Sequence, residues 1–178
     1  MTKSARGFTL VELLVVISII AILSAIGLVI FSGAQKSGRT AKRIGDLKAI
    51  QTALEVYYSR NGSYPTTGEA TGKGVNCANG QWGGAWVSEC SLWGSKASDQ
   101  VVPGLVPSYI VAFPQDPQMD KVASKSCYLY TSDGTDYKLL DHIVSEFTAA
   151  DYQSQKNLVD PMRPTWAWAV YTDGGRCW

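Results

Sequence analysis

The N-terminal part of the chain contains one long apolar stretch, which largely decides the fold. Residues 6–31 read RGFTLVELLVVISIIAILSAIGLVIF, and from residue 8 onwards Glu12 is the only ionisable residue in it. The uninterrupted apolar run 13–31 has 19 residues. As a helix rising roughly 1.5 Å per residue it covers about 28 Å, close to the apolar core of one bilayer. We therefore expect a membrane-spanning helix here rather than the core helix of a soluble domain.

The helical pattern continues beyond this run into a polar stretch. Apolar residues recur every three or four positions, the spacing of one helical face, at Ile44, Leu47, Ile50, Leu54 and Tyr57. Four charged residues lie off this stripe, namely Arg43, Asp46, Lys48 and Glu55. The pattern stops at Asn61 and Gly62, a usual left-handed helix ending. The spacing predicts one helix from about Thr9 to Arg60, with a bend or local melting in its glycine-containing middle.

The remainder of the chain predicts a loop followed by a small antiparallel sheet. Residues 62–100 are rich in glycine and include Trp82, Trp86 and Trp93. Strand-forming residues begin at Cys127, residues 132–135 (SDGT) supply a turn, and residues 136–143 can return antiparallel. A polar insertion at 144–164, partly helical, precedes a third strand at 165–172. The predicted fold class is α+β, with the amphipathic half of the helix packed on the sheet.

Charge is distributed unevenly between the helix and the rest of the chain, which we call the head. Residues 1–61 contain eight Lys or Arg and three acidic residues, a net charge of +5, whereas residues 62–178 contain eight basic and twelve acidic residues, a net charge of −4. An acidic head argues against nucleic-acid binding there, because phosphates demand positive charge.

Four cysteines follow the apolar run, and their even number favours two disulfides in an oxidising compartment. They are Cys77, Cys90, Cys127 and Cys177. Three pairings are possible. We favour Cys77 with Cys90, closing a short Gly-rich loop, and Cys127 with Cys177, tying the last residues to a strand. No C-x-x-C pair is present and His142 is the only histidine, so zinc ligation is poorly supported.

The N-terminus does not have the order of a secretory signal, which would carry a small-residue cleavage site after its apolar run. Here a short polar leader, residues 1–7, comes first, and Arg6-Gly7 stands directly before Phe8-Thr9-Leu10-Val11-Glu12. This string resembles the class III signal of type IV pilins and of the pseudopilins of type II secretion. The resemblance is near complete over residues 6–24 and looser to about residue 60. Beyond that it is architectural, through P-x-D-P at 114–117 and the strand residues from Cys127.

The resemblance implies processing and assembly at the start of the helix. A prepilin peptidase would cut after Gly7 and methylate the new N-terminal residue, Phe8. Many pilins have a helix-breaking proline near Val29 and a glycine near Ala21. This chain has neither, so the resemblance does not extend to melting of the helix inside a filament.

Glu12 is the candidate assembly residue. A carboxylate at the edge of an apolar helix is costly, and such residues are usually functional. Cleavage after Gly7 would create a positive amine on Phe8, with which the Glu12 of a neighbouring subunit could pair. The alternative is that Glu12 simply reaches the lipid headgroups.

The expected organisation is a cleaved leader (1–7), an apolar helix (8–31), its amphipathic continuation (32–61) and an extracytoplasmic head (62–178). We expect the leader in the cytoplasm and the head outside, which Lys3 and Arg6 favour. Four basic residues after the span oppose that orientation and are expected at the lipid headgroups before assembly: Lys36, Arg39, Lys42 and Arg43. The implied partners are a prepilin peptidase, related subunits, inner-membrane assembly machinery and membrane lipid.

The leading functional hypothesis is a non-enzymatic, pilin-like subunit of a surface filament, without a cofactor. The runner-up is a pseudopilin of a secretion filament, and a third hypothesis is a solitary membrane-anchored module that binds a ligand through its tryptophans. Asp133 and Asp136 are weak calcium candidates, because their spacing matches no calcium loop and turn chemistry explains Asp133. His142 has no nucleophile partner in the sequence and is expected to be structural.

Overall fold

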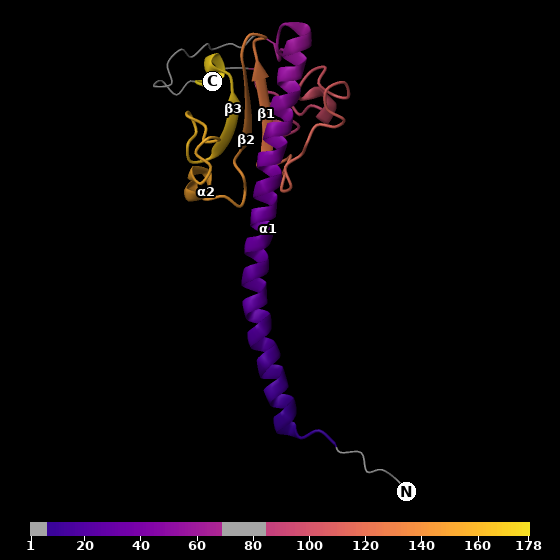
Figure 1. Ribbon diagram of the computed structural model, residues 1–178, viewed down its shortest axis with the longest axis vertical. Coiled ribbons are helices and arrows are strands. Elements are labelled where there is room, and N and C mark those ends of the chain that lie inside the picture. The colour runs from indigo at the N-terminus through magenta and orange to yellow at the C-terminus, as the bar shows by residue number, and fades with distance from the viewer. Residues whose placement is uncertain (1–6, 69–84) are drawn as a thin grey trace. The chain divides into compact units, whose positions relative to one another are not determined.

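The computed structural model describes residues 7–68 and 85–178 (Figure 1). The chain divides into two compact units between Thr40 and Ala41. Each unit is described by itself below.

Helix α1 runs from Leu10 to Asn61, 52 residues, and contributes to both units. Its bounds lie within one residue of those predicted from the hydrophobic spacing. The helix ends at Gly62, whose φ of +74° is readily adopted only by glycine. The Gly62 N–H donates to the Tyr58 carbonyl at 2.8 Å, and the Asn61 side-chain amide donates to the Tyr57 carbonyl at 2.8 Å. These two bonds satisfy carbonyls that the helix end would otherwise leave open.

The second unit contains a three-stranded antiparallel sheet in the order β1-β2-β3. The strands are β1 (Cys127–Ser132), β2 (Tyr137–His142) and β3 (Ala167–Tyr171), joined between β1 and β2 by a turn in which Gly134 has a φ of +92°. The short helix α2 (Ala149–Gln153) lies in the insertion before β3. The α+β fold class predicted from the sequence is therefore confirmed.

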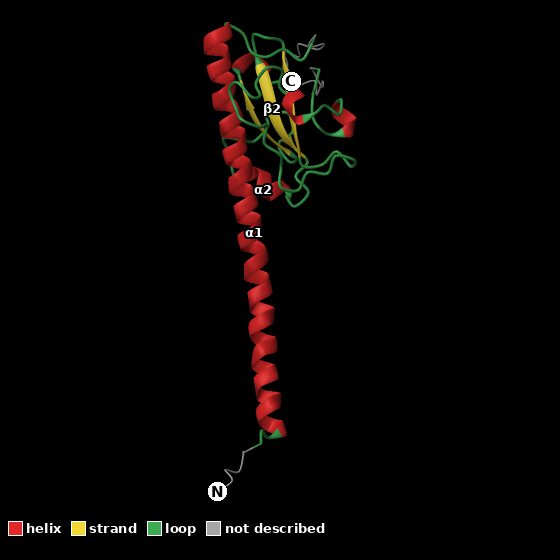
Figure 2. Ribbon diagram, turned by 90° about the vertical axis from the view of Figure 1, so that its right-hand side faces the viewer, coloured by secondary structure: helices red, strands yellow, loops and turns green. Residues whose placement is uncertain are grey.

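One face of the sheet packs against the part of α1 that belongs to the second unit (Figures 1 and 2). Leu47, Ile50 and Leu54 are fully buried on the helix side of this core. The sheet and the insertion contribute the other side through Tyr130, Leu139, Trp168 and neighbouring residues. The helical stripe read from the sequence thus faces the sheet across one apolar core. Each Å² of apolar area buried there stabilises the fold by about 25 cal/mol.

The opposite face of the sheet is covered by the segment 85–96. Val87 and Tyr130 exchange backbone hydrogen bonds of 2.8 and 2.9 Å, so this segment lies directly beside β1. Residues on both sides form a second small core: Leu129, Leu140, Ala167 and Ala169 from the sheet, with Cys90, Trp86 and Trp93 from the segment. Strands β1 and β2 are consequently buried at every position.

The disulfide pairing predicted from the sequence is wrong. Cys90 is bonded to Cys127, with their Cα atoms 6.4 Å apart, so neither the pair Cys77 with Cys90 nor the pair Cys127 with Cys177 can form. The physical reason is the Val87–Tyr130 bridge, which brings Cys90 to the start of β1. Cys177 is also disulfide-bonded, and Cys77 and Trp82 lie outside the described residues.

Candidate functional site

The start of α1 is the site that the sequence singles out. Gly7, Phe8 and Thr9 precede the helix and have no regular secondary structure. All three are exposed, Phe8 to 80%, and a Cβ added at Gly7 would meet nothing within 4 Å. The Gly7–Phe8 peptide bond therefore lies in a non-helical segment with no side chain on the glycine to obstruct it.

Thr9 and Glu12 form a reciprocal cap on the first turn. The Glu12 N–H donates to the Thr9 hydroxyl at 3.2 Å, and the Glu12 carboxylate accepts from the Thr9 N–H at 2.9 Å and from the Thr9 hydroxyl at 2.8 Å. This arrangement is a capping box, which satisfies N–H groups that have no partner within the helix. It explains why the helix begins at Leu10 and leaves the two preceding residues outside it. The capping role of Glu12 was not predicted from the sequence.

The first unit presents an apolar helix surface. Every described Leu, Val, Ile and Phe side chain from residue 8 to residue 31 is at least 45% exposed. Among the described residues, α1 is the one helix long and apolar enough to cross a membrane. An apolar surface of this extent requires lipid or other protein to cover it, which suits membrane anchoring.

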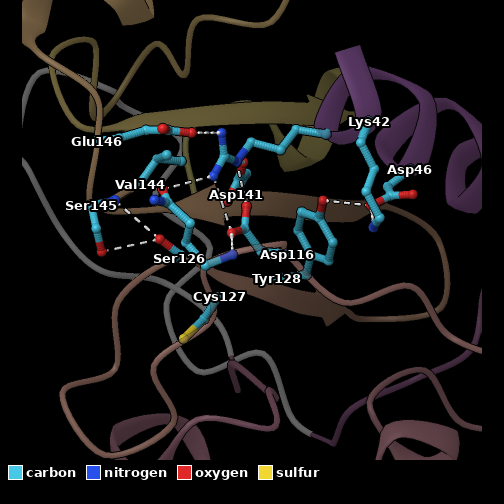
Figure 3. A network of polar contacts seen from close by, with 12 residues as sticks. Lys42, Asp46, Asp116, Ser126, Cys127, Tyr128, Asp141, Val144, Ser145 and Glu146 are labelled. Carbon is cyan, nitrogen blue, oxygen red and sulfur yellow. Dashed lines mark hydrogen bonds and ion pairs between the residues drawn. The ribbon is translucent and has the colours of Figure 1, made fainter. Parts of the chain in front are cut away.

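A second polar site lies where α1 packs against the head, around Arg43, a residue that the sequence analysis placed wrongly. Arg43 was expected off the buried stripe and near lipid headgroups, but it is fully buried. Its guanidinium donates to Asp116 through Nε and Nη2 (2.5 and 3.2 Å) and to Glu146 through Nη1 at 2.6 Å. Figure 3 shows Asp116, Asp141 and Glu146 converging from three different segments of the head. Arg43 of α1 therefore forms ionic contacts with strand β2 and with two loops.

The charges around Arg43 are not balanced one to one. Asp141 lies 3.8 Å from Arg43 Nε and is fully buried, and neither of its carboxyl oxygens has a hydrogen-bond partner among the described residues. Burial and the nearby Asp116 raise the pKa of Asp141 well above its usual range, against the opposing effect of Arg43. Asp141 is thus held toward its neutral form. Burial disfavours the charged form of Arg43, but the hydrogen bonds with Asp116 and Glu146 outweigh it and raise the Arg43 pKa.

Lys42 and Asp46 extend this network toward the surface. Lys42 Nζ donates to Asp46 at 2.6 Å and to the carbonyl of Gln115 at 2.7 Å, while the Tyr128 hydroxyl donates to Asp46 at 2.9 Å. Lys42, which was also expected at the headgroups, therefore contacts the head. Figure 3 shows the Tyr128 hydroxyl reaching Asp46 beside it.

A separate buried ion cluster is centred on Lys138 of β2, on the face of the strand opposite Asp141. Lys138 Nζ lies 2.7 Å from Asp160, and Arg163 Nη1 lies 2.9 Å from the second oxygen of the same carboxylate. Both cations also donate to the main-chain oxygen of Trp178. Burial lowers the pKa of Lys138 to about 8 despite the attraction of Asp160. The cluster fixes the last residues of the chain onto β2.

The other candidate residues from the sequence, Asp133, Asp136 and His142, contact turns or aromatic rings of the head. The Asp133 carboxylate accepts from the N–H groups of Thr135 and Asp136, and Asp136 accepts from Gly174 N–H at 3.1 Å, so both carboxylates hold turns. Within residues 7–68 and 85–178, no group of three or more His, Cys, Asp or Glu side chains is arranged to hold a metal ion. His142 is buried between the rings of Trp93 and Trp166, at centroid distances of 5.4 and 5.3 Å.

Comparisons with known proteins agree with the N-terminal site. The family described as "Prokaryotic N-terminal methylation motif" matches residues 2–31. Together with the capped apolar helix and the small sheet, this motif and the relatives described next support the family of type IV pilins and type II secretion pseudopilins.

Two kinds of relative are similar to the chain. Type II secretion system core protein G of Escherichia coli is 37% identical over 68 residues, 38% of this chain and 47% of that protein. The core protein G of Dickeya chrysanthemi is 33% identical over 72 residues, 40% of this chain and 47% of that protein. The type IV major pilin PilA of Myxococcus xanthus is 39% identical over 59 residues, 33% of this chain and 27% of that protein. The chain thus matches about half the length of core protein G or less. No solved structure matches it significantly.

Proposed function

We propose that this chain is a precursor that is cut between Gly7 and Phe8 and then assembles, through α1, into a pilin-like filament. The observation that carries the proposal is the junction at the start of α1. An exposed, non-helical Gly7–Phe8 bond stands directly before a capped helix whose apolar surface is uncovered. The methylation motif found over residues 2–31 supports cleavage by a prepilin-type peptidase and methylation of Phe8.

Assembly through α1 is expected because lipid and neighbouring subunits can each cover the apolar surface of the helix. Before assembly the apolar surface of residues 8–31 is covered by lipid, and in a filament the same surface is covered by the helices of neighbouring subunits. The amine created on Phe8 would pair with the Glu12 of a neighbour, and a wrong axial register would leave both charges unpaired. The head, with its disulfide, belongs on the oxidising side of the membrane. The role is structural, with no catalytic step assigned to any residue.

The test is the mass and N-terminal sequence of the protein in filaments sheared from cells. Removal of seven of the 178 residues leaves 171, and we expect a chain of that length with one methyl group on Phe8. An N-terminus at Met1, or one beyond residue 31, would overturn the proposal. A monomer that keeps its leader would favour the solitary binding module instead.

A pseudopilin is the second candidate, and a specific observation favours it. Several of the similar proteins are named type II secretion system core protein G. The two candidates differ in where the filament ends, since a pilus extends beyond the cell and a pseudopilus stays within the envelope. Immunogold labelling of the head on intact cells distinguishes them, because only filaments outside the cell surface are then labelled.

A further inference from the structure

Asp141 is a buried carboxyl group on the face of the sheet that packs against α1. It lies on the central strand β2, and its register partners are Tyr128 of β1 and Trp168 of β3. Directly opposite residues of antiparallel strands point to the same face of a sheet, and both aromatic side chains belong to the core shared with α1. Asp141 itself is 0% exposed. Its carboxyl group is therefore enclosed by the core and cut off from the surrounding solution.

The hydrogen-bond donors around Asp141 are directed at other acceptors. Neither of its carboxyl oxygens has a hydrogen-bond partner within residues 7–68 and 85–178. Arg43 Nε lies 3.8 Å from Asp141 Oδ2, which is too far for a hydrogen bond. The neighbouring donors are each bonded elsewhere: Arg43 to Asp116, Glu146 and Gln118, the Tyr128 hydroxyl to Asp46, and the Trp168 indole to the Tyr152 carbonyl. These donors therefore do not stabilise a negative charge on Asp141 by hydrogen bonding.

The cations around Asp141 are also shared with other carboxylates. Lys42 lies 2.6 Å from Asp46, and Arg43 forms ion pairs with Asp116 and Glu146. The charged and titratable groups that face Asp141 come from α1, the loop before β1, β1 itself and the insertion before β3: Lys42, Arg43, Asp46, Asp116, Tyr128, Glu146 and Tyr152. An ionised Asp141 would be the fourth carboxylate beside two cations, and a buried charge without its own partner is costly. Burial and the nearby Asp116 accordingly raise the pKa of Asp141.

We propose that Asp141 is a proton-binding site, at which the packing of α1 on the sheet takes up one proton and through which that packing weakens as the pH rises. Unfolding exposes Asp141 to water, where it loses its proton with a pKa of about 3.9, whereas the folded head holds the proton to a higher pH. The stability that this proton supplies is complete below pH of about 3.9 and is lost as the pH rises toward the folded-state pKa. The neighbouring His142 acts in the opposite direction, because burial lowers its pKa in the folded head. A single subunit suffices for this proton binding, which is therefore independent of filament assembly.

The direct test is infrared spectroscopy of the full chain in mild detergent at neutral pH. A protonated carboxyl group has a C=O stretching band that a carboxylate lacks. We expect one such band in the wild type and its absence in Asp141→Asn. A wild-type spectrum without the band, or a band that persists in the variant, would overturn the assignment of the proton to Asp141.

Two buried carboxyl groups of this network provide matched variants for a stability measurement. Asp141→Asn keeps the shape of the protonated group and needs no proton, so it should raise the ratio of folded to unfolded chain at neutral pH by about tenfold or more. Asp116→Asn is the control, because the Asp116 carboxylate accepts hydrogen bonds from Arg43 through Nε and Nη2 and from the Gln118 N–H. The loss of that carboxylate should lower the same ratio by about tenfold or more. Denaturant titration of the full chain in mild detergent measures both ratios.

The pH dependence separates Asp141 from the other titrating groups. Wild type and Asp141→Asn are compared at each pH, so the contribution of His142 cancels. The advantage of the variant should shrink by about tenfold per pH unit as the pH falls from the folded-state pKa of Asp141 toward about 4, because the unfolded wild type then binds the proton as well. An advantage that does not change with pH would contradict the proposal. A loss of stability in Asp141→Asn equal to that in Asp116→Asn would also contradict it, because Asp141 would then act as an anion.

Discussion

Arg43 is the residue whose position departs most from its sequence pattern. A single guanidinium on α1 is fully buried among Asp116, Asp141 and Glu146. Removing one partner from a buried ion pair costs about 3–5 kcal/mol, because it leaves the other charges uncompensated. Arg43→Met should therefore lower the free energy of unfolding of the full chain in mild detergent by that amount.

Lys42→Met is the control for the Arg43 variant. Lys42 also contacts the head, but its side chain is 47% exposed, and exposed ion pairs contribute about 1 kcal/mol or less. Denaturant titration should therefore show a small loss for Lys42→Met and a large one for Arg43→Met. Equal losses would show that the buried charge of Arg43 is not what holds α1 to the head.

His142 should make the head sensitive to acid. Burial, assisted by the positive charge of Arg163, lowers the pKa of His142 to about 4. The unfolded chain binds a proton at His142 with a pKa of about 6.5, whereas the folded head resists protonation until about pH 4. The stability that is present above pH 6.5 is therefore lost as the pH falls toward 4. We expect the contribution of His142 to the free energy of unfolding to fall by about 3 kcal/mol over that interval. His142→Phe, which cannot titrate, should remove this contribution from the stability–pH curve. An unchanged slope would show that the imidazole is not responsible.

At the scale of single elements, the start of α1 combines a capping role with the proposed assembly role of Glu12. Glu12→Gln keeps an oxygen that can accept from Thr9 but loses the charge, whereas Glu12→Leu loses both. If charge pairing drives assembly, both variants should insert and be cleaved, and both should fail to give sheared filaments. Ser18→Ala is the control, because the Ser18 hydroxyl donates to the Val15 carbonyl of its own helix and takes no part in the cap formed by Thr9 and Glu12. Normal filament yield from Glu12→Leu would show that Glu12 does not direct assembly, and normal yield from the Gln variant alone would assign the role to the cap.

The segment 85–96 depends on its disulfide. Cys90 and Cys127 are separated by 37 positions, and in a chain-entropy treatment a loop of this size stabilises the fold by about 3–4 kcal/mol. The double variant Cys90→Ala, Cys127→Ala should lose about that much and should be cut by proteases within 85–96. Peptide mapping without reductant should recover Cys90 joined to Cys127. Recovery of Cys90 joined to Cys77 would contradict the structure.

The elements themselves were predictable because their signals are local. The spacing of Leu47, Ile50 and Leu54 located the helix face, and the SDGT turn located the hairpin. The disulfide and the Arg43 cluster were not predictable, since both depend on contacts between residues far apart in the sequence. Two signals were nevertheless present: Lys138 and Asp141 are charged residues inside an apolar strand, and such residues are rarely buried without a partner. They indicated that buried cations and anions would be needed, but not which ones.

For the whole molecule, the division at Ala41 makes a direct prediction about fragments. The fragment 41–178 contains every core residue of the second unit that the structure describes, including Leu47, Ile50 and Leu54. Produced in an oxidising compartment, it should fold and unfold cooperatively on heating. The fragment 62–178 lacks these side chains, each worth about 1.5–3 kcal/mol on burial, and should be degraded or aggregate. Cooperative unfolding of the shorter fragment would show that α1 is dispensable to the head.

Arg43 also contributes to the resistance of the second unit to a pulling force. A pull applied along α1 enters the second unit at its first residues, and Arg43 is the third of them. There the force passes into the carboxylates of Asp116 and Glu146 and reaches the central strand through Asp141. Separating helix from sheet under tension would require several buried ionic contacts to break together with the apolar core behind them. The head is therefore anchored against traction at the point where the helix enters it.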